Sequence, residues 1–212
     1  MTENISVNEQ NSIRIEGEHG VLYVDPFRIS GSSNDADFIF ITHDHYDHFS
    51  PDDIAKVAGN DTTLVVPEKM EDKAQQVADL VSSIVTVRPQ ESRELDGLVF
   101  ETIPAYNNLK PFHPKSAKWV GYIFTIDGKR IYVAGDTDAT SEAKAVKCDI
   151  AMVPAGGTYT MDAKKAAELV NEICPKVAIP VHYGTVAGNP SDGEIFAENV
   201  DDAIKVEMKI SF

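Results

Sequence analysis

Short apolar runs separated by turn residues characterise the first part of the chain. Residues 12–15 alternate between apolar and polar, and an apolar run over 21–24 follows a Gly-Glu-His-Gly segment, which predicts a hairpin. Residues 38–41 are apolar without interruption, as in a strand buried on both faces. Ser50 precedes a proline and two acidic residues, a pattern typical of a helix start, and predicts a short helix over 51–58. The chain therefore begins with extended pairs.

Strand and helix patterns then alternate. Strands are predicted over 63–66, 84–87, 98–103, 119–126, 130–134, 150–153, 177–180 and 205–210, and helices over 68–81, 162–173 and 192–199. An Asp-Gly pair at 127–128 predicts a tight hairpin turn. Hairpins mixed with α/β units favour an α/β fold with two mixed sheets and helices outside. No repeat or linker divides the chain, so a single domain over 1–212 is predicted.

Composition narrows the functional classes. The chain has 212 residues, 42% of them hydrophobic, which is enough to bury a core. A net charge of -15 disfavours nucleic-acid partners. Without a long apolar stretch or a leader-like start, no membrane partner and a cytoplasmic location are expected. Cys148 and Cys174 form no metal or redox motif and are predicted to be small buried hydrophobic residues.

The strongest chemical signal directly follows the apolar strand 38–41. It is the segment His43-Asp44-His45-Tyr46-Asp47-His48. Neutral imidazoles and carboxylates bind zinc and similar divalent metals, and two pairs of ligands directed to different sides can serve two adjacent ions. The alternative is a polar loop with solvated or hydrogen-bonded histidines, in which protonated imidazoles would repel one another.

Two more candidate ligands stand at the ends of predicted strands. Asp136 follows strand 130–134 in an Ala-Gly-Asp-Thr turn, where its carboxylate can bridge two ions. His182 follows the apolar run 177–181. Either feature alone is usually structural, but beside the histidine segment we interpret both as metal ligands.

These motifs resemble those of the metallo-β-lactamase superfamily. The resemblance rests on His43-x-His45-x-Asp47-His48, Ala134-Gly135-Asp136-Thr137 and Pro180-Val181-His182. Two further segments are similar to the bacterial metal-dependent hydrolase branch related to L-ascorbate-6-phosphate lactonase and N-acyl-phosphatidylethanolamine phospholipase D, namely Asp25-Pro26-Phe27 and Gly156-Gly157-Thr158-Tyr159-Thr160. The resemblance implies a four-layer αββα sandwich with the metals at one edge. It also implies one site held by His43, His45 and a third histidine, and a second held by Asp47, His48 and His182, with Asp136 shared.

The third histidine of the first site is where the sequence departs from the family pattern. Relatives carry it just after an Ala-aromatic pair, but here Ala105-Tyr106 is followed by Asn107. We predict that His113, in a loop with two prolines, is the missing ligand. Asn107 is the alternative, although its amide oxygen is a weaker ligand. His19 is the remaining histidine, and we interpret it as structural or solvated.

The resemblance and the ligand types together predict a metal-dependent hydrolase. Two divalent ions would hold a bridging water, lower its pKa to near 7 and place the resulting hydroxide beside an ester-type bond, in a phosphoester, a lactone or a similar group. Asp47, which would orient the nucleophile, and Asp136, which would space the ions, are the predicted catalytic residues. Zn²⁺ is the expected metal, with Mn²⁺, Ni²⁺ and Fe²⁺ as alternatives. Asp25 and Thr42 are candidate partners of the imidazoles.

The expected partner is a small-molecule substrate, and local charge makes an anionic one an option. No acidic residue lies between Glu101 and Asp127, whereas Lys110, Lys115 and Lys118 surround the predicted third histidine. A basic rim that steers an anion is one interpretation, and a solvated loop with ordinary lysines is the other.

Nearby aromatic residues have simpler interpretations. Tyr106, Tyr159 and Tyr183 are interpreted as packed aromatics in preference to donors to substrate. Trp119 is interpreted as an anchor of the strand that follows it.

Two other classes of function stay open at this stage. An iron-loaded oxidoreductase would use the same ligands, but the chain has no dinucleotide glycine motif or iron–sulfur cysteine pattern. A non-catalytic metal-binding scaffold is the second alternative, although structural zinc sites usually close with four ligands, often including cysteine. The sequence leaves the oligomeric state open.

Overall fold

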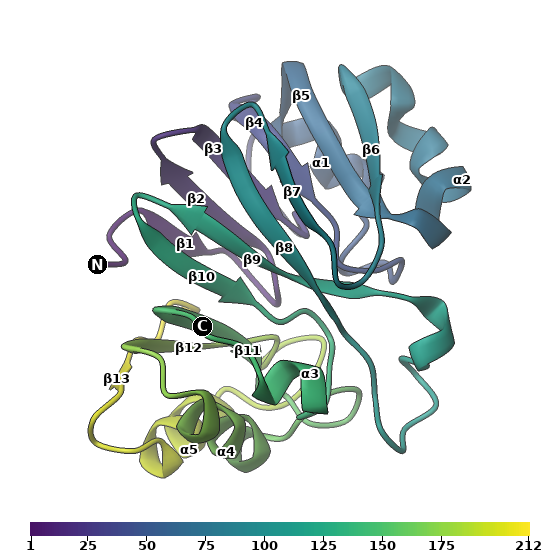
Figure 1. Ribbon diagram of the computed structural model, residues 1–212. Coiled ribbons are helices and arrows are strands. Elements are labelled where there is room, and N and C mark those ends of the chain that lie inside the picture. The colour runs from purple at the N-terminus through teal and green to yellow at the C-terminus, as the bar shows by residue number, and fades with distance from the viewer.

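Two β-sheets face each other in the computed structural model, which describes residues 1–212 (Figure 1). The first sheet has the strand order β1 (Ile5–Val7), β2 (Ile13–Gly17), β3 (Gly20–Val24), β4 (Ala36–Phe40), β5 (Ala58–Pro67) and β6 (Ser83–Val87). The second has the order β13 (Lys205–Val206), β12 (Val177–Val181), β11 (Ile150–Pro154), β10 (Lys129–Val133), β9 (Val120–Ile126), β8 (Leu98–Pro104) and β7 (Ser92–Leu95). Each sheet combines an antiparallel part with a parallel part, as the mixed sequence pattern predicts.

Helices cover the outer face of each sheet (Figure 1). Next to the first sheet lie α1 (Pro51–Val57), η1 (Glu68–Met70), α2 (Glu71–Ala74) and η2 (Gln75–Leu80). Next to the second lie α3 (Ser141–Lys144), α4 (Ala163–Ile173) and α5 (Asp192–Asn199). These four layers confirm the predicted αββα sandwich. A bilayer crossing would need a longer and more apolar helix than any present here.

The central core lies between the two sheets and contains 25 buried residues drawn from both. Phe40 stands at its centre with no exposed surface. Its ring meets those of Phe100, Tyr122 and Phe124 edge to face, at centroid distances of 5.0, 5.1 and 4.8 Å. Since β4 leads directly into the histidine segment, this aromatic packing fixes the strand end from which that segment starts.

Replacing Phe40 with alanine is expected to lower the free energy of unfolding by about 3–5 kcal/mol, because it removes buried surface and leaves a cavity. Urea unfolding followed by circular dichroism measures the change. Val99→Ala, at a side chain that is 37% exposed on β8, is the matched control and should cost less than about 1 kcal/mol. Equal losses in the two variants would contradict this assignment of the core.

Most predicted elements are confirmed, and the exceptions have local causes. The hairpins at 17–20 and 127–128 and the Ser50-capped helix form as predicted. The helix predicted over 68–81 is broken into η1, α2 and η2, and the strand predicted over 205–210 covers only 205–206. The short elements β1, β7 and α3 carry too few residues for a periodic signal.

The prediction that both cysteines are buried is wrong. Cys148 is only partly buried, and Cys174 is exposed. Cys174 has a left-handed backbone, with φ of 50°, and ends α4 as its C-cap, so its position is set by the end of the helix and not by the core.

Candidate metal centre

The histidine segment forms the loop between β4 and α1. The backbone N–H of Phe49 donates to the carbonyl of His45 at 2.8 Å, which closes the loop on itself. Two bonds tie its start to the second sheet: the Val120 N–H donates to Thr42 O at 3.2 Å, and the Tyr122 hydroxyl donates to Ile41 O at 2.7 Å. The loop is therefore held between the sheets.

The other candidate ligands reach the same edge from the second sheet. His113, Asp136 and His182 follow β8, β10 and β12 respectively. These three strands run in the same direction, so their carboxyl ends share one edge. Residues far apart in sequence thus meet at the mouth of the sandwich, where the sequence motifs predicted a centre.

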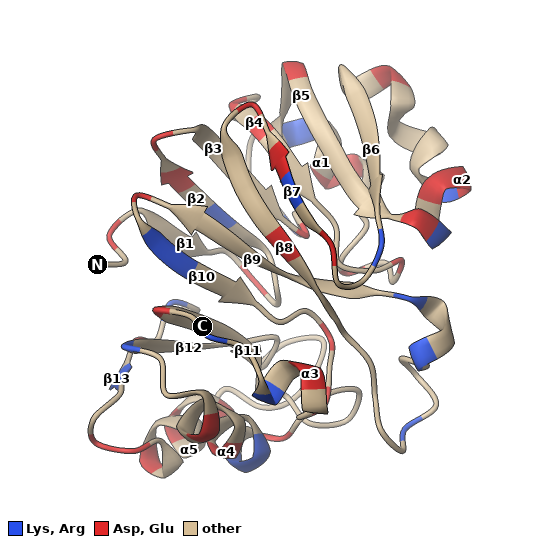
Figure 2. Ribbon diagram, viewed as in Figure 1, with Lys and Arg blue, Asp and Glu red and all other residues tan.

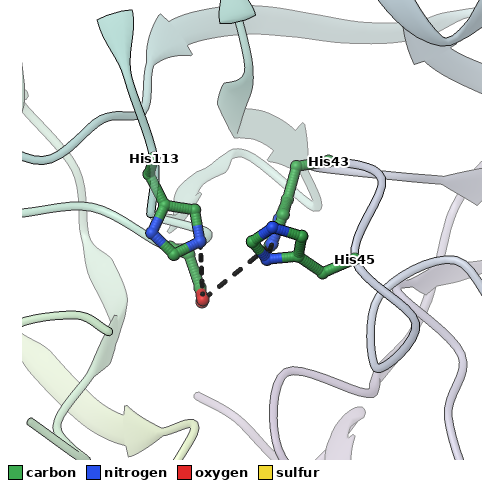
Figure 3. Close-up of side chains that lie close together, drawn as sticks. His43, His45 and His113 are labelled. Carbon is green, nitrogen blue, oxygen red and sulfur yellow. Dashed lines mark hydrogen bonds and ion pairs between the residues drawn. The ribbon is translucent and has the colours of Figure 1, made fainter. Parts of the chain in front are cut away.

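The first group consists of His43, His45, His113 and Asp136, whose ligand atoms all lie within 4.8 Å of one another. His43 Nε2 and His45 Nδ1 are 3.0 Å apart. His113 Nε2 lies 3.2 Å from Asp136 Oδ2, and His43 Nε2 lies 3.9 Å from the same oxygen. Figure 3 shows the three imidazole rings gathered around this oxygen.

The second group consists of Asp47, His48 and His182, again within 4.8 Å of one another. His182 Nε2 lies 3.3 Å from Asp47 Oδ2. The other Asp136 oxygen, Oδ1, faces this group, at 3.5 Å from His48 Nε2 and 3.4 Å from His182 Nε2. Asp136 therefore directs one oxygen at each group.

Several buried polar atoms at the centre have no hydrogen-bond partner, which indicates whether these residues suit a metal ion. Asp136 Oδ1 and the Nε2 atoms of His48, His113 and His182 are buried without a hydrogen-bond partner. An unpaired buried polar group costs about 1–3 kcal/mol, and folded proteins rarely leave several together. Divalent metal ions would satisfy all four atoms, so the donor set fits metal binding.

Asp25 supports the second group from behind, as the sequence suggested. Its Oδ2 lies 2.7 Å from His48 Nδ1 and accepts bonds from the Thr42 hydroxyl at 2.6 Å and the Asn11 amide at 2.7 Å. A carboxylate on Nδ1 fixes the imidazole tautomer that leaves Nε2 free for a metal. Asn11 was missed from the sequence, because nothing in its neighbourhood along the chain signals this contact.

Left-handed backbone positions aim two of the ligands. His182 has φ of 54°, which is unusual for a residue with a side chain, and its N–H donates to Gln10 O at 2.9 Å. Gly135, before Asp136, has φ of 64°, and a Cβ there would lie 3.1 Å from the Cβ of Thr42. Both positions hold a tight turn at a strand end.

Burial and neighbouring charges set the protonation of the centre. Burial, aided by the nearby His48, holds the pKa of His43 well below its usual range. Burial works in the same direction on His48, but the carboxylates of Asp136 and Asp25 outweigh it and raise the pKa of His48 to about 9. Burial opposes ionisation of Asp136, yet the surrounding histidines, His182 first, hold its pKa well below the usual value.

Comparison with known proteins identifies the family. The profile described as "Beta-lactamase superfamily domain" matches residues 4–182, which is most of the chain. The chain belongs to the metallo-β-lactamase superfamily. A UPF0173 metal-dependent hydrolase of Pyrococcus abyssi is 32% identical over 208 residues, covering 91% of this chain and 89% of the relative. One of Methanosphaera stadtmanae is 31% identical over 228 residues, covering 94% and 92%.

Solved structures agree with this assignment to the superfamily. A structure assigned to a metal-dependent hydrolase of Parabacteroides distasonis has a TM-score of 0.80 and 27% identity, covering 98% of this chain and 93% of that one. Igni18, a metallo hydrolase of Ignicoccus hospitalis, has a TM-score of 0.76 at 21% identity and shares the fold, with coverage of 96% and 93%. The finer branch related to the lactonase and the phospholipase stays a prediction.

His113, predicted as the third histidine of the first site, lies with that group, so the position of its ring is compatible with the prediction. His113 is fully buried inside the first group, and its Nδ1 lies 3.0 Å from Asn107 Oδ1. The amide oxygen of Asn107 is therefore occupied by the ring and not directed at the group. His19, by contrast, lies beside Glu18 and Gly97 in the β2–β3 turn, outside the centre.

Replacing Asn107 with alanine is expected to weaken metal binding by about 10- to 100-fold, the usual effect of losing a partner that orients a ligand. Competition with a chromophoric zinc chelator measures the change. Asn108→Ala, at the exposed neighbouring position, should bind zinc as the parent does. Unchanged affinity in Asn107→Ala would overturn the orienting role, and loss in both variants would indicate general damage to the loop.

Trp119 does more than the sequence suggested. Its carbonyl accepts from the Ala105 N–H at 3.0 Å, consistent with an anchor before β9. Its ring also packs against His43, His45 and His113, at centroid distances of 5.0, 5.1 and 5.5 Å. Trp119 is therefore the apolar wall of the first group, a contact between loops that no local sequence signal reveals.

Tyr106 and Tyr183 are confirmed as packed aromatics, whereas Tyr159 packs only in part and borders the site. The hydroxyl of Tyr106 donates to Glu142 at 2.8 Å, and Tyr183 is buried with its hydroxyl on a methionine sulfur. Tyr159 packs edge to face on Phe112, with centroids 4.9 Å apart, but keeps 37% of its surface exposed.

The lysines of the β8–β9 segment are largely neutralised by residues distant in sequence. Figure 2 shows basic and no acidic residues along that segment, as the sequence indicated. In three dimensions Lys115 pairs with Glu142 at 2.8 Å, and Lys110 lies 3.9 Å from Asp138. Lys118 alone forms no ion pair. The structure favours ordinary loop lysines over a basic rim.

Proposed function

We propose that this chain is a metal-dependent hydrolase whose seven His and Asp ligands hold two divalent ions. The observation that carries the proposal is the position of Asp136, which directs Oδ2 at the first group and Oδ1 at the second. A carboxylate placed in this way is suited to bridge two ions. The names of the relatives support the same activity, since they are metal-dependent hydrolases.

The donor set indicates the type of metal. It contains imidazoles and carboxylates and no thiolate, which suits Zn²⁺ first and also Mn²⁺, Ni²⁺ or Fe²⁺. When bound, a pair of such ions lowers the pKa of water to near 7 and polarises the oxygen of a carbonyl or phosphoryl group. That chemistry favours hydrolysis of an ester-type bond at neutral pH.

The residues of the chain contribute geometry and charge. Asp47 lies at the open side of the second group and lines the cavity there, so its carboxylate is placed to orient the attacking water. Asp25 and Asn107 hold the rings of His48 and His113 in position from behind.

Two other functions use the same ligands. An iron-loaded oxidoreductase would require tightly bound iron and a source of electrons, and a non-catalytic scaffold would require metal without turnover. We favour hydrolysis because the groups open on a cavity, whereas a structural metal site is usually closed by its ligands.

A substrate screen tests the proposal. Protein loaded with zinc or manganese is assayed against p-nitrophenyl carboxylic esters, p-nitrophenyl phosphate, bis(p-nitrophenyl) phosphate, lactones and thioesters. We expect turnover of at least one class, lost on chelation and restored by the metal. Asp47→Asn should remove it, while Asp52→Asn, at an exposed position on α1, should not. Turnover that survives both chelation and Asp47→Asn would contradict the proposal.

A further inference from the structure

A cavity of about 280 Å³ opens directly over the candidate metal centre. Its floor is made by four candidate ligands: His45, Asp47, Asp136 and His182. A larger hollow of about 610 Å³ lies elsewhere, beside β8 and α3, and contains none of the ligands. The smaller cavity is therefore the place where the reacting bond of a substrate would lie.

Aromatic and aliphatic side chains form the rest of the cavity. They are Tyr46, Phe112, Tyr159 and Val186. Phe112 and Tyr159 come from two different loops and pack edge to face, which fixes the wall. Their exposed fractions are 41% and 37%, large values for aromatic rings that have a partner. This exposed apolar surface is available to a ligand, whose burial against it would be favourable.

No lysine or arginine lines this cavity. Lys110, in the same loop as Phe112, donates its ammonium hydrogens to the carbonyl oxygens of Thr160 and Gly157, and so joins the two loops that carry the wall. An anionic substituent would meet mainly carbon surface, with no lysine or arginine side chain in the lining. The volume is also slightly below the roughly 300–1,000 Å³ of typical ligand pockets, which limits the substituent to a small one.

We propose that the cavity binds an uncharged apolar group, a phenyl ring or a short acyl chain, on the substrate next to the scissile bond. This inference rests on the proposed function, because it places the scissile bond over the metals. It assigns Phe112 and Tyr159 as specificity-determining residues. The group expected in this cavity is therefore apolar, and not the anionic group that the lysines of the sequence had left as an option.

Metal-chelating hydroxamates of different size test the inference without requiring turnover. Zinc-loaded protein is titrated calorimetrically with acetohydroxamic acid and with benzohydroxamic acid, which share the chelating group and differ in the apolar substituent. Benzohydroxamic acid is expected to bind about tenfold more tightly, since burial of the ring contributes on the order of 1.4 kcal/mol. Phe112→Ala and Tyr159→Ala should each reduce that ratio to about threefold or less, with the affinity for acetohydroxamic acid unchanged.

Leu109→Ala is the matched control, because Leu109 lies in the same loop as Phe112, is 98% exposed and does not line the cavity. It should keep the tenfold ratio. Equal binding of the two compounds by the parent protein, or a ratio unaffected by both aromatic variants, would overturn the inference and leave the metal centre intact. Failure to bind either compound would overturn the metal centre itself, and the inference with it.

Discussion

Replacing Asp136 with asparagine is expected to remove at least one of the two proposed ions and to lower hydrolysis by on the order of 10³-fold or more, in the range of losses seen for single catalytic groups. The isosteric amide keeps the volume and loses the charge. It can offer its one oxygen to only one group, so its NH₂ would face the nitrogens of the other, where Asp136 now places a carboxylate oxygen 3.2 to 3.5 Å away.

Asp138→Asn is the matched control for this effect. Asp138 lies two residues away in the same loop, is partly exposed and contacts Lys110 instead of the centre. Metal content and hydrolysis of the best substrate are measured for both variants beside the parent. Retention of both ions by Asp136→Asn would show that this carboxylate does not bridge, even if activity fell.

Removing the metals is expected to lower the melting temperature by roughly 8 °C or more. A ligand present at 1,000 times its dissociation constant stabilises the fold by about 4 kcal/mol, and in chains of this length each kcal/mol moves the melting temperature by roughly 2–4 °C. The physical reason lies in the buried nitrogens of His48, His113 and His182, which have no partner without a metal.

Calorimetric melting of chelated and zinc-loaded protein measures this difference, with chelator removed from both samples by dialysis. Asp136→Asn provides the control, since its melting temperature should respond far less to zinc. Equal melting temperatures for the two forms of the parent protein would contradict the interpretation of the orphaned nitrogens as metal ligands.

Local patterns were sufficient to predict the parts of the centre that follow strands directly. The apolar run of β4 ends at the histidine segment, and Asp136 and His182 follow strands in the same way, so the sequence indicated that each lies at a strand end. Their meeting at one edge of the sandwich followed from the resemblance to the superfamily. Local patterns could not decide whether His113 or Asn107 is the third ligand of the first group. Both lie in one loop, and only the folded loop shows that the amide bonds the ring at 3.0 Å.

Contacts between distant segments were beyond the sequence. The acid-free stretch around Lys115 suggested a basic rim, because the sequence does not reveal that Glu142, from α3, lies 2.8 Å away. The packing of Trp119 against three histidines and the bond from Asn11 to Asp25 are of the same kind. Such contacts depend on how loops from two sheets meet, and the pattern of apolar and polar residues along the chain carries no information on that meeting.

Metal content per chain tests the central claim most directly. Untagged protein purified without added metal is analysed by inductively coupled plasma mass spectrometry, then dialysed against zinc and analysed again. We predict about two divalent ions per chain after dialysis, held by the two groups that share Asp136. Less than about a tenth of an ion per chain, with no uptake on dialysis, would contradict the metal centre and the hydrolase proposed from it.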